Sequence, residues 1–178
     1  VMIQQVKVAP FSPESNRDRF LHFAFMSISN KEWGDGTSNG PMSEQTAKAC
    51  FKSLTTPEAV TVYCCAAITT PASVPGSPAV SIDLRQTDNT FWQVFDFAFV
   101  AGKPYDQATF DSGRPVAVLT ESVSRALFGT TESVGYEFLL NHAPYKVVGI
   151  VKDVSTLASS SYGQVWIPYT STDLAKDT

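Results

Sequence analysis

The sequence lacks a hydrophobic run long enough to cross a lipid bilayer. A transmembrane helix needs about 20 consecutive apolar residues, whereas the best continuous apolar stretch, 62–68, has the length of a strand. The residues that follow Val1 also lack the pattern of a secretion signal. We therefore expect the chain to begin within a longer protein or after processing, with any membrane-spanning parts outside these residues.

Features of nucleic-acid and nucleotide binding are missing as well. The net charge is −4, and no basic run could follow a phosphate backbone. A phosphate-binding loop needs an earlier glycine and a Ser or Thr after its Gly-Lys pair, but Gly102 and Lys103 are followed by Pro104. We expect no nucleic-acid partner and no nucleotide or other cofactor bound by this chain.

Residues suited to catalysis or metal binding are scarce. The two histidines, His22 and His142, lie in different segments without metal-ligand spacing. Cys50, Cys64 and Cys65 are expected to be small buried apolar residues, although a disulfide from Cys50 to either of the others is compatible with an oxidising compartment. We expect no catalytic and no metal-binding residues. A thiol hydrolase that pairs Cys64 or Cys65 with His22 is the minor alternative.

The composition indicates a folded protein with a substantial core, because 43% of the residues are hydrophobic and only 17% are charged. Strands are expected over 1–8, 20–28, 59–68, 79–84, 97–100, 115–119, 136–140, 145–151 and 164–169. Helices are expected over 43–53, 89–96 and 120–128, and loops over 30–40, 70–78, 141–144 and 157–162. Strands and helices neither alternate strictly nor segregate, which favours the α+β class.

Three local signals support these helices. Ser43, Asp88 and Thr120 are residue types that cap helix N-termini. In the helix after Thr120, the apolar residues Val123, Ala126 and Leu127 are expected to form the buried face.

An aromatic cluster follows Asp88, with five aromatic residues between Phe91 and Phe99. Such a cluster could line a ligand cradle, but aromatic side chains at this density more often form core packing. We expect core packing here.

The second half of the chain carries an ordered series of motifs. An aromatic pair precedes a glycine with a basic residue, a polar segment, a VAVL strand, a helix ending in Leu-Phe-Gly, a further glycine and a VVGI strand. These motifs are Phe91 and Phe95, Gly102 with Lys103, 106–111, 116–119, Leu127-Phe128-Gly129, Gly135, and 147–150. In this order and spacing the stretch from Phe91 to Tyr169 resembles the MacB-like periplasmic core domain of permeases with an FtsX-type membrane module. One departure is Tyr136, where that family usually has lysine.

The glycines of these motifs have structural roles. Gly129 can end a helix in the left-handed conformation, Gly135 can follow a tight turn, and Gly149 inside a strand indicates a bulge or close backbone approach. We therefore interpret the motif as scaffold rather than active site. The scaffold residues are Phe91, Phe95, Gly102, Leu127, Phe128, Gly129, Gly135 and Gly149.

The resemblance implies a two-lobed domain that lies between two membrane helices of a permease. Residues 1–86 and 152–178 would form a porter-like lobe, and 87–151 a smaller inserted α/β lobe.

The domain would lie on the periplasmic face of a bacterial inner membrane and would itself not be an enzyme. Its partners would be the transmembrane helices of the same permease, a second permease protomer and a cytoplasmic ATPase, with a periplasmic adaptor left open. It would transmit ATP-driven conformational change to export or extraction of a substrate. The alternative is a secreted ligand- or protein-binding domain without membrane helices.

Overall fold

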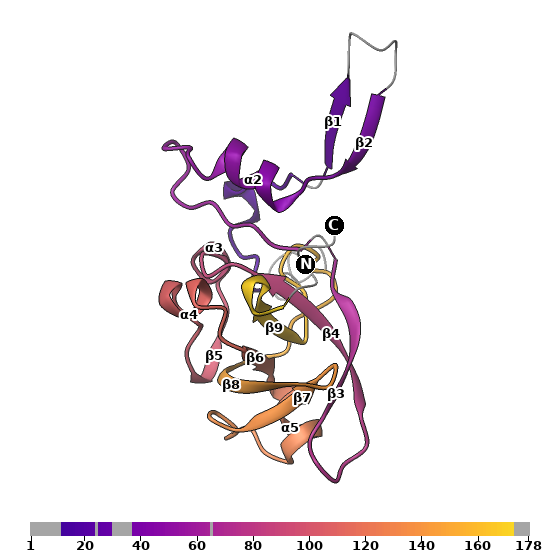
Figure 1. The fold of residues 1–178 in the computed structure, drawn as a ribbon. Helices are drawn as coiled ribbons and strands as arrows, with labels where there is room; N and C mark the ends of the chain where they lie inside the picture. The colour runs from indigo at the N-terminus through magenta and orange to yellow at the C-terminus, as the bar shows by residue number, and fades with distance from the viewer. Residues whose placement is uncertain (1–11, 24, 30–36, 65, 173–178) are drawn as a thin grey trace.

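The computed structural model describes residues 12–23, 25–29, 37–64 and 66–172 (Figure 1). Its helices are η2 (Arg17–Arg19), α2 (Glu44–Phe51), α3 (Phe91–Val94), α4 (Gln107–Asp111), α5 (Glu121–Phe128) and η3 (Tyr169–Ser171). Its strands are β1 (Phe25–Ser29), β2 (Thr37–Pro41), β3 (Ile68–Ser73), β4 (Val80–Thr87), β5 (Phe99–Gly102), β6 (Val116–Thr120), β7 (Glu137–Leu140), β8 (Ala143–Val151) and β9 (Val165–Pro168). The α+β class expected from the sequence is confirmed, since short helices accompany a mixed sheet. The strand expected over 1–8 lies outside the described residues.

Most strands belong to one seven-stranded sheet that closes on itself. The long strand β8 pairs with β6 along one edge and with β7 and β5 along the other, and β7 also pairs with β3. The strands β8, β6, β9, β4, β3 and β7 therefore form a closed ring, with β5 attached outside it. We call this ring, together with β5, the closed sheet. Figure 1 shows the hairpin of β1 and β2 and the helix α2 on one side of it, beyond α3.

Strand β6 separates two hydrophobic cores. All five of its residues are buried, as expected for a central strand that is covered on both faces. Ala117 and Leu119 belong to the core inside the closed sheet, whereas Val116 and Val118 belong to an aromatic core formed with α3. This division follows from the alternation of side chains along a strand.

The apolar run 59–68 does not form the strand expected from its composition. In the described part of this run, a single bridge joins Tyr63 to Thr87, and regular pairing begins only with β3 at Ile68. The backbone passes the end of β4, where Cys64 N donates to Gln86 O at 2.9 Å. Tyr63 packs into the aromatic core, so this run is apolar because of tertiary packing rather than strand alternation.

Part of the expected loop 70–78 is strand β3, although it contains Pro71. Pro71 O accepts from Asn141 N, on the edge that faces β7. The N–H and C=O of one residue point to the same side of a strand, so the N–H that Pro71 lacks would also face β7. Strand β7 pairs with β3 only at Ala72 and Ser73. The proline therefore leaves the pairing with β4 intact.

Several further predictions differ from the structure. Residues 37–40 lie in β2 rather than in a loop, whereas 20–23 precede β1 and are not in a strand. The expected polar segment 106–111 contains the short helix α4, which Asp106 caps by accepting from Thr109 N at 2.8 Å. This hydrogen bond from a backbone N–H is the largest cause of the lowered pKa of Asp106. The loop expected at 30–40 otherwise lies outside the described residues.

Helix boundaries set by capping residues are confirmed. The Ser43 hydroxyl accepts from Thr46 N at the start of α2, and the Thr120 hydroxyl accepts from Val123 N at the start of α5. Gly129 ends α5 with a φ of 72°. The buried face of α5 is only partly as expected, because Ala126 is exposed.

On the buried face of α5, a serine takes the place that was expected for Ala126. Ser124 is fully buried, and its hydroxyl donates to Thr130 O at 2.6 Å and is hydrogen-bonded to the Ser133 hydroxyl. A hydroxyl can be buried here because both of its hydrogen-bonding functions are satisfied.

Strand pairing crosses both expected lobe boundaries, which lie after residue 86 and after residue 151. Strands β3 and β9 come from the expected porter-like segments, yet β3 pairs with β7 and β9 pairs with β6. The closed sheet thus begins at β3 rather than at residue 87. The division of the domain into two lobes stays a prediction.

Candidate functional site

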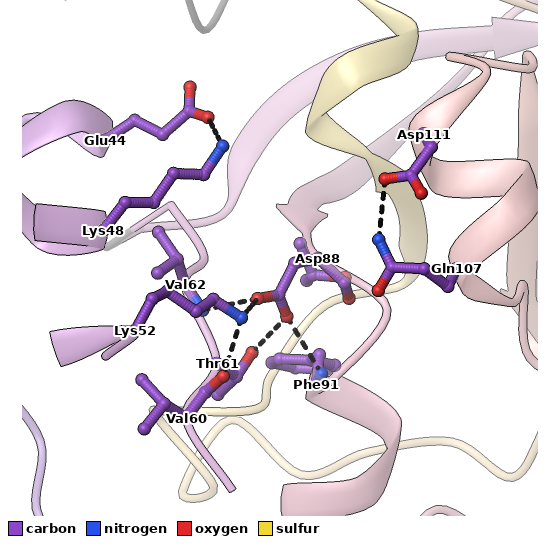
Figure 2. A network of polar contacts seen from close by, with 11 residues as sticks. Glu44, Lys48, Lys52, Val60, Thr61, Val62, Asp88, Phe91, Gln107 and Asp111 are labelled. Atoms are coloured by element: carbon purple, nitrogen blue, oxygen red, sulfur yellow. Dashed lines mark hydrogen bonds and ion pairs between the residues drawn. The ribbon is translucent and has the colours of Figure 1, made fainter. Parts of the chain in front are cut away.

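The segment before the closed sheet joins it at a buried carboxylate, that of Asp88, directly after β4. Figure 2 shows Lys52, Thr61, Val62 and Phe91 directed at this carboxylate. Lys52 follows α2, Thr61 and Val62 belong to the segment that leads toward β3, and Phe91 begins α3. We call the contacts of Asp88 with these four residues the junction.

The geometry of the junction satisfies both oxygens of Asp88. Oδ2 lies 2.8 Å from Lys52 Nζ and accepts from Val62 N at 3.0 Å. Oδ1 accepts from the Thr61 hydroxyl at 2.6 Å and from Phe91 N at 3.1 Å. The Asp88 side chain is only 2% exposed, whereas that of Lys52 is 34% exposed. A carboxylate at this depth is tolerated because a cation and several donors surround it.

Asp88 also binds the start of α3, as expected from the sequence, although the N-cap residue of this helix is Thr90, which makes no side-chain capping bond. Asp88 accepts from the backbone N–H of Phe91, the first residue of α3, although α3 is shorter than the expected helix over 89–96. One side chain therefore holds the start of α3 and the segment at 61–62 at the same time. In addition, Lys52 Nζ donates to Val60 O at 2.8 Å, which brings the end of α2 to the same point.

An aromatic core lies beneath the junction and confirms the packing interpretation of the cluster at 91–99. Phe91 is fully buried and Phe95 is 3% exposed. Tyr63 meets both rings edge-on, at 5.4 Å and 6.1 Å between ring centroids, and Phe20 meets Phe95 in the same way at 5.5 Å. The rings thus connect residues before the closed sheet with α3, and they are not available as an exposed ligand cradle.

Two tyrosine hydroxyls, those of Tyr105 and Tyr162, are hydrogen-bonded to side chains of β4 in the closed sheet. Burial is the largest cause of the raised pKa of Tyr105, whose hydroxyl is hydrogen-bonded to that of Thr87. Burial and then a hydrogen bond donated to Asp83 at 2.7 Å raise the pKa of Tyr162 to about 12. Both phenols therefore stay protonated at neutral pH, and they act as hydrogen-bonding groups rather than as bases.

Gly102 and Gly149, two of the predicted scaffold residues, lie opposite each other in the antiparallel pairing of β5 with β8. A Cβ atom on Gly102, whose φ is +64°, would lie 2.2 Å from Val148 O and 2.9 Å from the Gly149 Cα. A Cβ atom on Gly149 would lie 2.7 Å from Lys103 O. The pairing of β6 with β8 also shifts by one residue next to Gly149. The bulge and the close backbone approach predicted at Gly149 are both confirmed.

The remaining scaffold residues lie at the far end of the closed sheet, around α5. Leu127 is buried in the core inside the sheet, and Phe128 packs against that core and meets Tyr136 edge-on at 5.4 Å. Gly129 and Gly135 have φ values of 72° and 90° in open surroundings. These residues shape turns and packing and do not converge with the junction.

Two of the three thiol groups and both imidazole groups lie in the described residues. Cys50 is exposed, contrary to expectation, and Cys64 is half-buried with its Sγ 3.7 Å from Gln86 Oε1. His22 is exposed and stacks on Tyr63 at 5.8 Å, and His142 is exposed in the turn between β7 and β8. Cys65 lies outside the described residues. Within the described ranges, no group of three or more His, Cys, Asp or Glu residues could hold a metal ion.

Sequence reasoning missed three residues with prominent roles. Lys52 was not singled out because its partner Asp88 is 36 residues away. The buried Glu14 and Arg85 were missed for the same reason, since both bond to the segment 157–162, which was expected to be a surface loop. Instead, Ala158 and Ser161 within that segment are fully buried. No local pattern marks such long-range polar pairs.

Comparisons with known proteins agree with these motifs. The model of the family described as MacB-like periplasmic core domain matches residues 7–177. A macrolide export ATP-binding/permease protein MacB of Burkholderia cenocepacia (strain HI2424) is 32% identical over 84 residues, which are 46% of this chain and 12% of that protein. A pyoverdine export ATP-binding/permease protein PvdT of Pseudomonas savastanoi pv. phaseolicola (strain 1448A / Race 6) is 28% identical over 90 residues, which are 49% of this chain and 14% of that protein. The chain thus spans a small part of these relatives.

Solved structures show the same fold. The extracellular domain of the noncanonic ABC-type transporter YknZ from Gram-positive bacteria has a TM-score of 0.64 at 16% identity, over 86% of this chain and 76% of that chain. The periplasmic region of MacB from Actinobacillus actinomycetemcomitans has a TM-score of 0.54 at 21% identity, over 71% of this chain and 56% of that chain.

The described residues of this chain contain no helix that is both long and apolar enough to cross a membrane. The family model spans almost the whole chain, and the fold agrees with solved members. The chain therefore belongs to the MacB-like periplasmic core domain family, the periplasmic core domains of MacB- and YknZ-type ABC permeases.

Proposed function

We propose that this domain transmits ATP-driven conformational change from the membrane part of an ABC permease to the export or extraction of a substrate on the outer side. The junction is the observation that carries this proposal. A lever must pass displacement from one segment to another without a flexible link between them. Here the segment before the closed sheet is attached through a buried charge, three donors of its own and edge-on aromatic rings.

The proposal includes the place of the domain and its partners. We place it on the periplasmic face of the inner membrane, attached to transmembrane helices of the same permease and beside a second permease protomer. A cytoplasmic ATPase supplies the energy, and a periplasmic adaptor is a further candidate partner. In this arrangement the closed sheet forms most of the smaller lobe, and the residues before β3 belong to the porter-like lobe.

The first test is the reading frame that encodes the chain. We expect it to encode a hydrophobic span of about 20 residues shortly before Val1 and further spans after Thr178. Hydropathy along the complete translated reading frame provides the measurement. A reading frame with a secretion signal and no such spans would instead support the secreted binding domain.

The second test follows the domain during the ATPase cycle. A spin label is attached through a non-canonical amino acid at Tyr136, which is 50% exposed at the end of the closed sheet away from the junction. The native cysteines then remain in place. Distances between the two protomers are measured by pulsed electron resonance in the intact permease in nanodiscs, with and without ATP and vanadate. We expect the distance distribution to shift with nucleotide and to return when nucleotide is removed.

The control for this experiment is a permease whose ATPase cannot bind ATP, which should show one distribution under both conditions. If the wild-type permease also keeps one distribution, the domain is not driven by the ATPase and the proposal is wrong.

A further inference from the structure

A second buried carboxylate, that of Glu14, fastens the start of the described chain to the closed sheet. Its side chain is fully buried. Oε1 accepts from Ser160 N at 2.8 Å, from Ser161 N at 2.9 Å and from the Ser161 hydroxyl at 3.0 Å. These donors belong to the turn at 158–162, which is separated from β9 by two residues.

The same turn is bound from its other side by Arg85 of β4, which is only 2% exposed. The Arg85 guanidinium donates to Tyr162 O, and to Ser159 O at 3.2 Å. The N–H groups of the turn therefore point at the Glu14 carboxylate, and its carbonyl groups point at the Arg85 guanidinium. Oriented peptide dipoles of this kind stabilise charges that would otherwise be costly to bury.

Residues 12–16 have another attachment next to α3. Asp96 N donates to Pro13 O at 2.9 Å, and the side chains of Ser15 and Asn16 both donate to Asp96 Oδ2. A displacement of residues 12–16 would thus reach two places, the end of α3 and the turn before β9. Strand β9 lies between β4 and β6 in the closed sheet, so the turn leads into a strand that is paired on both edges.

The charge next to Glu14 suggests that this attachment can open. Arg17 Nε lies 3.3 Å from Glu14 Oε2, three residues further along the same segment. If residues 12–16 leave the turn, this cation leaves with the carboxylate, so Glu14 keeps a partner as it enters water. The junction differs, because opening it would separate Lys52 from Asp88, two residues on opposite sides of the contact.

We propose that Glu14 and the turn at 158–162 form a releasable latch, and that it opens and closes during the transport cycle while the junction stays closed. This role in the cycle rests on the proposed function, whereas the latch itself can be tested without nucleotide. The latch determines when movement of residues 12–16 reaches β9.

Hydrogen exchange followed by mass spectrometry in the intact permease tests the latch. In Glu14→Ala, the backbone amides of Ser160 and Ser161 lose their acceptor, and we expect their exchange to become about tenfold faster without nucleotide. The matched control is Glu58→Ala, which removes an exposed carboxylate paired with Arg19 at 2.7 Å and should leave these amides unchanged. Amides of β9 report on global unfolding and should keep their protection in both variants.

The wild-type permease provides the second arm. We expect exchange at Ser160 and Ser161 to differ between the nucleotide-free and the ATP–vanadate states, while that of Val62, in the junction, stays constant. Unchanged exchange in Glu14→Ala would overturn the latch. Constant exchange at the turn, combined with a nucleotide-dependent shift of the Tyr136 label, would overturn its opening but leave the proposed function intact. If neither the exchange at the turn nor the Tyr136 distance changes with nucleotide, that result counts against the proposed function as well.

Discussion

Replacement of Gly102 by alanine is expected to lower the free energy of unfolding by about 3 kcal/mol, since overpacking and a left-handed backbone each cost on the order of 1 to 3 kcal/mol. The new Cβ would lie 2.2 Å from Val148 O, a backbone atom that cannot turn aside as a flexible side chain can. Strands β5 and β8 would have to separate at their pairing of Gly102 with Gly149. The melting temperature should fall by roughly 10 °C for a domain of this size.

A matched variant separates the two causes of this effect. Gly76 also has a positive φ, +83°, but a Cβ there meets nothing within 4 Å. Gly76→Ala therefore carries the backbone strain without the clash, and we expect it to cost about 1 kcal/mol. Thermal melting followed by circular dichroism measures both variants. Equal melting temperatures would show that close approach of β5 and β8 is not what requires glycine at position 102.

Local chemistry made some elements predictable from the sequence. The hydroxyls of Ser43 and Thr120 bond to amides only three residues away, so capping depends on neighbours that the sequence displays. The left-handed conformation of Gly129 is equally local, because glycine is the residue that adopts it at little cost. The bulge at Gly149 was predictable because glycine weakens a strand interior and is therefore found there mainly at bulges and close backbone contacts.

Closure of the sheet was not predictable, because it depends on contacts between distant segments. Strand β3 contains Pro71, which reads locally as a loop signal, and its place in the sheet comes from pairing with β4 and with the distant β7. The run 59–68 failed in the opposite direction. It has strand composition, but Tyr63 packs on Phe91 and Phe95 instead of extending a ladder.

The polar contacts of the site show the same limit. Asp88 was recognisable as a residue that binds the start of a helix, but Lys52 lies 36 residues before it. Glu14 and Ser160 are separated by 146 residues. The segment 157–162 was expected at the surface because its serines are polar. Its burial becomes favourable only when a carboxylate and a guanidinium from elsewhere satisfy its peptide groups.

Removal of the Asp88 carboxylate should have the largest effect among the polar contacts, and we expect Asp88→Ala to cost about 4 kcal/mol, because each buried donor left without an acceptor costs about 1 to 3 kcal/mol. Most of this cost comes from donors left without an acceptor. Phe91 is fully buried, so its N–H cannot turn to water, and the Thr61 hydroxyl also loses its acceptor. Lys52 is partly exposed and can be solvated instead.

Asp111 of α4, also drawn in Figure 2, offers a matched control. Its carboxylate is exposed and accepts from Gln107 Nε2 at 2.6 Å, so Asp111→Ala should change stability by less than about 0.5 kcal/mol. Urea unfolding of both variants measures the difference. Similar unfolding midpoints would mean that the junction is as weak as a surface contact. In that case the segment before the closed sheet would be loosely attached, and displacement could not pass from it to α3 and β4 as a transmitting domain requires.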